Sequence, residues 1–260
     1  MRTVTVALLL SFTSIAFAQT SSQATAIGDA QAITLAQKSI AALTGGASIS
    51  DVTLNANVIS ILGSDNETGT GTFRAKGAAE SRVDLNLTGG VRSDVRSNTN
   101  GIPSGAWVSN GGASTAYAQH NCWTDSSWFF PAFSSLGQSG NPNFVFKYIG
   151  QEQHRGVNTQ HIQIFQSLPS FAPSQQLSAM DFYLDPATFL PLAIAFNSHT
   201  DTNMNVNIPT EVLFANYQLV SGIQVPFHFQ QMFSGSVILD ATVTNESFNN
   251  GVLDSVFVLP

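Results

Sequence analysis

The chain has 260 residues, of which 43% are hydrophobic, 10% aromatic and only 10% charged, and its formal net charge at pH 7 is −7. Residues 156–260 contain seven acidic residues and no Lys or Arg. That half therefore lacks the cationic clusters that bind nucleic acid or anionic lipid headgroups. A single cysteine, Cys122, excludes an internal disulfide framework. We expect no nucleic-acid partner and a fold stabilised by its hydrophobic core.

The first eighteen residues have the order of a secretory signal peptide. Arg2 gives a positive start, residues 4–17 are apolar but too short to span a membrane, and Ala16-Phe17-Ala18 fits a cleavage site. The next residue is Gln19, whereas a lipid anchor would need Cys there. The sequence predicts a signal peptide over 1–18 cleaved after Ala18, a periplasmic or secreted product, and a single domain over 19–260.

A helix over 29–43 and a meander of strands are the first predicted elements of that domain. Asp29 is placed to cap the helix, and Gly45-Gly46 allows a left-handed end. The apolar period then changes to two, with turn residues between the runs. The predicted strands cover 52–58, 73–76, 83–87 and 91–96.

The meander contains five of the basic residues, which a binding patch would also require. They are Arg74, Lys76, Arg82, Arg92 and Arg96. Glu80, Asp84 and Asp94 are interleaved with them. Opposite charges on neighbouring strands are typical of a solvated sheet face, and we interpret the meander in that way.

Residues 97–146 contain all three tryptophans and only one formal charge, Asp125. Thr124 or Asp125 is placed to cap a short helix that ends near Pro131. Large apolar side chains without charge must cover something apolar. The stretch is therefore an aromatic plug on the concave side of a sheet, the wall of a lipophilic cavity, or both. The candidate ligand-binding residues are Trp107, Trp123, Trp128, Phe129, Phe130 and Phe133.

Strands resume after Asn143, with hairpin turns at 185–188, 221–222 and 234–235. The predicted strands cover 144–149, 160–166, 178–185, 189–198, 211–220, 223–233 and 236–246. Pro226 cannot donate a ladder hydrogen bond, so its strand has an edge or a bulge there. The predicted fold class is mainly β, with antiparallel strands.

Patterns for catalysis or metal binding are scarce in this chain. His120 and Asp125 flank Cys122 and allow a nucleophile hypothesis, but a single Cys beside aromatics is typical of a small buried hydrophobe. The histidines lack the paired spacing of zinc sites. Asp181 and Asp185 share one face of a strand whose other face is apolar, so we expect both to point to water. The sequence predicts no catalytic residue, no metal and no cofactor.

Three segments near the C-terminus share a strand-turn-strand pattern or a distinctive ending. They are YLDPATFLPLAIAF (183–196), VLFANYQLVSGIQVPFHFQ (212–230) and NNGVLDSVFVLP (249–260). Together they resemble the LolA-like periplasmic lipoprotein-carrier superfamily, most closely its divergent lipoprotein-sorting-like members. The aromatic stretch 97–142 is longer than the lid of the family's carriers, and no residue that acts in lipoprotein transfer can be carried over.

The resemblance implies a large curved antiparallel sheet, a half-barrel, with an N-terminal helix and a short helical, aromatic lid around an apolar cavity. The helix and residues 123–136 should cover the concave face, since a sheet with alternating apolar residues needs a cover. That face should carry Phe73, Val83, Leu85, Val91, Met180, Phe182 and Leu184.

The functional expectation is a non-catalytic, monomeric protein that binds a lipid or acylated ligand, with a membrane protein as a transient partner. One alternative is a carbohydrate-binding or purely structural β-sandwich protein. The other is a hydrolase that uses Cys122 and His120.

Overall fold

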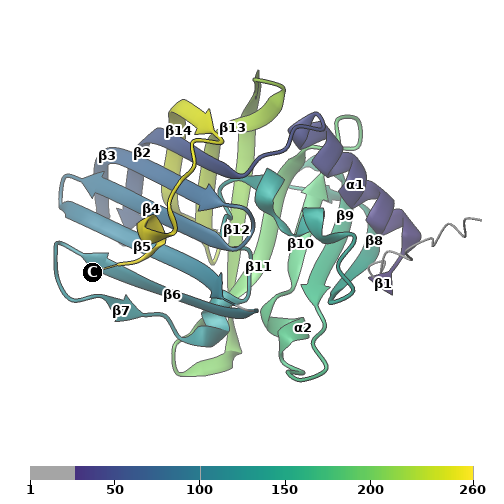
Figure 1. The fold of residues 1–260 in the computed structure, drawn as a ribbon, viewed down its shortest axis with the longest axis horizontal. Coiled ribbons are helices and arrows are strands. Elements are labelled where there is room, and N and C mark those ends of the chain that lie inside the picture. Colours follow the sequence, from purple (N-terminus) through teal and green to yellow (C-terminus); the bar gives the residue numbers. More distant parts are fainter. Residues whose placement is uncertain (1–26, 100, 260) are drawn as a thin grey trace, which may run out of the picture.

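The computed structural model describes residues 27–99 and 101–259, which form one large curled sheet with short helices on it (Figure 1). The signal peptide and the cleavage site after Ala18 lie outside these residues. In the first half the strands are β1 (Ile27–Gly28), β2 (Asp51–Leu62), β3 (Asp65–Lys76), β4 (Glu80–Leu87), β5 (Gly90–Thr99), β6 (Ile102–Ser109) and β7 (Thr115–Ala116). In the second half they are β8 (Phe144–His154), β9 (Val157–Gln166), β10 (Met180–Leu184), β11 (Pro191–Thr200), β12 (Asn203–Val220), β13 (Ile223–Phe233) and β14 (Ser236–Phe248).

The strand order is β1-β8-β9-β10-β11-β12-β13-β14-β2-β3-β4-β5-β6-β7, and β1 and β7 remain as open edges. Every neighbouring pair in this order is antiparallel except β1 and β8, which are parallel. The pairing of β14 with β2 joins the C-terminal hairpins to the N-terminal meander. This open, curled, mainly antiparallel sheet confirms the predicted fold class.

Short helices accompany the sheet. They are α1 (Ala30–Thr44), α2 (Ser174–Leu177) and the 3-10 turns η1 (Gln119–Cys122), η2 (Pro131–Phe133), η3 (Ser135–Gln138) and η4 (Asp254–Phe257). Within the two described ranges, no helix is long and apolar enough to cross a membrane.

Helix α1 lies across the sheet and ends as predicted, with Gly45 in the left-handed conformation (φ 58°) and its amide bonded to the Ala41 carbonyl. Its start differs from the prediction. Asp29 occupies the N-cap position, but its carboxylate accepts a hydrogen bond from the Tyr148 amide of β8 instead of capping the helix. The acid therefore attaches the helix to the sheet edge.

The concave face carries the core, and α1 and the aromatic segment cover it, as predicted. Five of the seven residues predicted for this face are buried in the core: Phe73, Val83, Met180, Phe182 and Leu184. Leu85 is partly buried and lines a cavity. The prediction for Val91 is wrong. Val91 is 49% exposed, because it pairs with Asn86 of β4 and so shares the convex face.

The aromatic stretch is less of a lid than the sequence suggests. Its first part is β6, a full strand of the sheet that pairs with β5 over eight residues. The expected helix near Pro131 is also absent from the described residues, where turns lead into η2 and η3. Asp125 does not cap a helix. It accepts hydrogen bonds from the amide and hydroxyl of Ser135 instead.

Pro226 lies at a local edge of the sheet, as predicted. It pairs with Tyr217 of β12, whereas the pairing of β13 with β14 begins only at His228. Pro226 has no amide hydrogen to donate, and because β14 does not pair with β13 at this position, no ladder hydrogen bond is lost.

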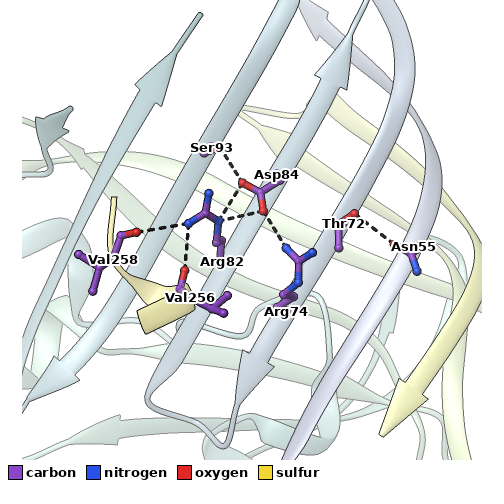
Figure 2. A network of polar contacts seen from close by, with 8 residues as sticks. All are labelled: Asn55, Thr72, Arg74, Arg82, Asp84, Ser93, Val256 and Val258. Atoms are coloured by element: carbon purple, nitrogen blue, oxygen red, sulfur yellow. Dashed lines mark hydrogen bonds and ion pairs between the residues drawn. The ribbon is translucent and has the colours of Figure 1, made fainter. Parts of the chain in front are cut away.

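The convex face of the meander carries an ion-pair network under the C-terminal segment (Figure 2). Asp84 accepts bonds from Arg74 and Arg82 at 2.8 and 2.9 Å, and Arg82 also donates to the Val256 carbonyl at 3.0 Å. Arg82 thus holds the segment that contains η4 against β4 and β5. This part of the meander is the solvated, charge-paired face that the sequence predicts.

Candidate functional site

A cavity of about 400 Å³ lies on the concave side of the sheet, between β4 and β5 and the ends of β11 to β14. Its apolar lining includes Val83, Leu85, Trp128, Phe196, Phe233 and Leu239. Its polar lining includes Asp94, Arg96, Tyr117, Asn121, Asp125 and His199. A partly enclosed space of this size, whose wall combines apolar side chains with convergent polar groups, is typical of a small-molecule site.

The aromatic segment forms the inner wall of this cavity. Phe73 of β3 lies at the centre of an aromatic cluster, with ring centroids 5.3 Å from Phe129, 5.0 Å from Phe229 and 6.2 Å from Trp128. Phe129 is fully buried, whereas Trp128 is partly buried and lines the cavity. The segment is thus both a plug, through Phe129, and a cavity wall, through Trp128.

The other candidate ligand-binding residues lie in different environments. Phe130 and Phe133 pack against each other in the core, with ring centroids 5.2 Å apart. Trp123 stacks on Phe171 at 5.0 Å. Trp107 is 42% exposed on β6. Of the six residues, Trp128 is the one that lines the cavity described above, and ligand contact by the other five stays a prediction.

Two charged residues of the lining, Asp94 and Arg96, come from β5, whose register places its charged residues inside. Asp94 pairs with Val83, and Arg92 pairs with Leu85, so their side chains share the concave face. The interpretation of all five basic residues as one solvated face is therefore wrong. Arg74 and Arg82 face outward, whereas Arg92 and Arg96 face the cavity side.

Arg96, Asp94 and Tyr117 form a compact group in the cavity wall. Tyr117 donates its hydroxyl hydrogen to Asp94, and the Arg96 guanidinium lies 4.7 Å from the Tyr117 ring centroid and 4.0 Å from Asp94. Burial raises the pKa of Asp94, although Arg96 and Tyr117 act against that shift. Burial and the charge of Asp94 raise the pKa of Tyr117 well above its ordinary value.

His199 is 4% exposed, and among the described residues neither of its ring nitrogens makes a hydrogen bond of good geometry. Burial lowers the pKa of His199; the Val206 carbonyl acts in the opposite direction, and His120, with its ring centroid 6.0 Å away, adds to the lowering. The imidazole is therefore neutral at pH 7, with one donor and one acceptor nitrogen. The Val206 backbone is thus a weak partner of the ring, and burial of an imidazole with so little hydrogen bonding is costly.

Asp125 is the other unusual acid of the lining. Burial raises its pKa to about 6, even though the amide and hydroxyl of Ser135 stabilise the charged form. No Lys or Arg pairs with it among the described residues. Asp125 thus contributes a negative charge to the cavity wall at pH 7.

The geometry does not support Cys122 and His120 as a catalytic pair. Burial raises the pKa of the Cys122 thiol, which opposes formation of the reactive thiolate. Its Sγ faces the Ala118 carbonyl at 3.9 Å, and His120 Nε2 lies 2.9 Å from the Thr200 carbonyl oxygen. Each group is therefore engaged with the backbone.

The remaining acids and histidines belong to other contacts. Asp181, on the convex face, lies 2.9 Å from His161 Nε2, and Asp185 binds the turn amides of Ala187 and Thr188. In the part of the chain that the structure describes, no group of three or more His, Cys, Asp or Glu side chains could hold a metal ion.

Comparison with known proteins gives a likeness in structure. No family model and no curated protein matches the sequence. Among solved structures, a DUF1329 family protein from Desulfovibrio piger aligns with TM-score 0.57 and 12% identity, over 88% of this chain and 96% of that one. A domain named for outer-membrane lipoprotein sorting, from Vibrio parahaemolyticus, aligns with TM-score 0.55 and 12% identity, over 87% of this chain and 96% of that one. A LolA superfamily protein from Nitrosomonas europaea aligns with TM-score 0.52 and 9% identity, over 88% of this chain and 97% of that one.

This chain has the LolA-like fold. The likeness spans nearly the whole of each of these neighbours, so the resemblance seen in the C-terminal hairpins extends to the meander and α1. In this LolA-like sheet, the sequence interpretation missed the polar part of the cavity, which includes Arg96, Tyr117 and His199. The two-residue turn at 88–89 is the one feature of the sequence that could have revealed the inward charges. Its length sets the register of β5 against β4, and that register decides which residues of β5 face the cavity.

Proposed function

We propose that this protein binds a lipophilic ligand noncovalently in its concave cavity and acts as a periplasmic or secreted carrier, not as an enzyme. The observation that carries the proposal is the cavity itself, with Trp128, Leu85 and Phe196 in its lining. Burying hydrocarbon against such a wall contributes about 0.8 kcal/mol per methylene. The names of two structural neighbours, lipoprotein sorting and LolA, are in keeping with this role.

The three tryptophans favour a lipid over a carbohydrate. A sugar-stacking surface would need exposed tryptophans along one shallow groove, whereas Trp107 is exposed, Trp123 is stacked on Phe171 and Trp128 faces the cavity. We further propose that the protein is a monomer and meets a membrane protein transiently when cargo is exchanged.

A titration with N-phenyl-1-naphthylamine tests the proposal, since this apolar dye becomes fluorescent in a hydrophobic cavity. Leu85→Trp should fill the cavity and weaken dye binding by about tenfold or more, which corresponds to about 1.4 kcal/mol. The matched control is Val91→Trp, which adds the same side chain to the exposed convex face of the neighbouring strand. Circular dichroism verifies that both variants fold.

Saturable binding that Leu85→Trp weakens and Val91→Trp leaves intact supports the proposal. Absence of dye binding to the folded wild-type protein, or equal loss in both folded variants, contradicts it.

A further inference from the structure

The charged groups in the lining of the concave cavity are mostly acidic. They are three carboxylates, Asp94, Asp125 and Asp201, and one guanidinium, Arg96. Burial lowers the pKa of His199, so its imidazole adds no positive charge at pH 7. Asp201 lies at the exposed turn after β11, whereas Asp125 is partly buried. A cleft whose walls carry mainly one sign of charge attracts ligands of the opposite sign.

The positive charge of Arg96 is already engaged by its neighbours. Its Nε lies 4.0 Å from Asp94 Oδ1, and its Nη1 donates to the Asn121 carbonyl at 2.6 Å. Arg92 faces the same side of the sheet, but it pairs with Glu67 at 2.7 Å and does not line the cavity. The cations on this side are therefore matched by acids other than Asp125.

Asp125 differs from these acids because its charge has no partner. Among the described residues, no Lys, Arg or His forms an ion pair with it. Its Oδ2 accepts from the amide and the hydroxyl of Ser135 at 2.8 and 3.1 Å, whereas its Oδ1 accepts no hydrogen bond from the described residues. Oδ1 is also not among the fully buried atoms that lack a partner, so it keeps surface that a ligand can reach.

Asp125 borders two cavities of different polarity. With Arg96 and Thr124 it lines both the concave cavity and a second one of about 310 Å³. Hydroxyl and amide side chains dominate the polar lining of the second cavity, which includes Ser97, Ser126, Gln138 and Asn141. A charged group beside Asp125 would thus have polar surroundings, while Trp128 and the other apolar side chains line the concave cavity.

We propose that the cavity prefers amphiphiles with an ammonium head, which binds to Asp125 while the hydrocarbon chain lies against Trp128. An ammonium group carries the opposite charge and donates three hydrogen bonds, so it can satisfy the free Oδ1. A hydroxyl head supplies a hydrogen bond without the charge, and a carboxylate head is repelled. The inference rests on the proposed function, since it names the class of ligand for the same cavity.

The acid state of Asp125 is consistent with this role. Burial raises its pKa to about 6, so the carboxylate is mostly ionised at pH 7 although its surroundings disfavour the charge. A bound cation compensates such a charge.

Three ligands with the same chain test the preference: laurylamine, lauryl alcohol and laurate. Each displaces the naphthylamine dye from the folded wild-type protein at pH 7, below the concentration at which any of the three aggregates. Laurylamine should bind at least about fivefold more tightly than the other two, which is a modest return for one charge-assisted hydrogen bond. Equal or tighter binding of lauryl alcohol or laurate overturns the inference.

A substitution at Asp125 tests whether this residue receives the head. Asp125→Asn should weaken laurylamine at least about fivefold and strengthen laurate. It should leave lauryl alcohol within about twofold, because the amide oxygen still accepts a hydrogen bond. The control, Asp65→Asn, makes the same change in net charge at an exposed hairpin tip outside the cavity lining and should change none of the three affinities. Circular dichroism verifies that both variants fold.

The results distinguish this inference from the proposed function. If the dye binds and all three ligands displace it equally, the cavity is lipophilic but does not select the head, and only this inference fails. An unchanged laurylamine affinity in folded Asp125→Asn, or an equal loss in Asp65→Asn, also overturns it. If neither the dye nor any of the ligands binds to the folded protein, the proposed function itself fails.

Discussion

The side-chain amide of Asn121 binds the backbone of His199 in the manner of a neighbouring strand: its Oδ1 accepts from the His199 amide at 2.7 Å, and its Nδ2 donates to the His199 carbonyl at 2.8 Å. This contact occupies the edge of β11 beyond Phe196, where the pairing with β10 has ended. It fastens η1, and with it the polar end of the cavity, to the sheet.

Asn121→Ala should therefore destabilise the protein by about 1–3 kcal/mol, because two backbone groups lose their partner. Urea unfolding followed by circular dichroism measures the change. Asn86→Ala, at an exposed position on β4, is the control and should cost less than about 0.5 kcal/mol. Equal stability of the two variants would show that the contact does not fasten η1.

Asp125 should make stability depend on pH in the direction opposite to a salt-bridged acid. Its folded pKa is raised to about 6, above the value of about 3.9 in an unfolded chain. The folded state therefore holds the proton over this interval, and the contribution of Asp125 to stability falls as pH rises from about 4 to about 6.

Asp125→Asn stays neutral, and its amide oxygen can still accept from Ser135. Relative to wild type, it should gain about 1–2 kcal/mol of stability between pH 4 and pH 6, as measured by urea unfolding at each pH. A constant difference between the two proteins across this range would refute the raised pKa.

Phe129 should contribute strongly to stability through its burial in the aromatic cluster around Phe73. It is fully buried against Phe73, so Phe129→Ala should cost about 3–5 kcal/mol through lost burial and a residual cavity. Trp107→Ala, at a 42% exposed position, should cost much less in the same unfolding assay. If the two costs are similar, Phe129 is not part of the core.

Cys122 should be dispensable for function. Because burial raises its pKa, the thiol should react slowly with iodoacetamide in the folded protein and rapidly after unfolding. Cys122→Ala should leave dye binding within about twofold of wild type, since the cysteine does not line the cavity that contains Trp128. Rapid alkylation of the folded protein would instead favour a reactive, solvent-accessible thiol.

Much of the fold is readable from apolar periodicity alone. The alternation in 52–58 and 83–87 identifies the concave face, and Gly45-Gly46 marks the end of α1. Strand β6 was missed because Ile102–Ser109 contains Pro, Gly and Ser without alternation. Its place in the sheet comes from pairing with β5, a nonlocal contact that composition does not encode.

The site is less readable because its parts come together only in three dimensions. Strand β5 alternates valines with charged residues, and either set could face the core. The register with β4 decides the matter: Val91 points outward, and Asp94 points inward opposite Val83. His199 joins them from β11 through Asn121, and no local pattern connects these residues.

The central claim is that a lipid binds in the concave cavity. Quenching of Trp128 fluorescence by a dibrominated oleyl alcohol tests it most directly, because bromine quenches tryptophan only at short range. Titration should give saturable quenching with one ligand per protein, and Trp128→Phe should abolish it, since Trp107 and Trp123 do not line this cavity. Quenching that persists unchanged in Trp128→Phe, or none in the folded wild-type protein, would contradict the account.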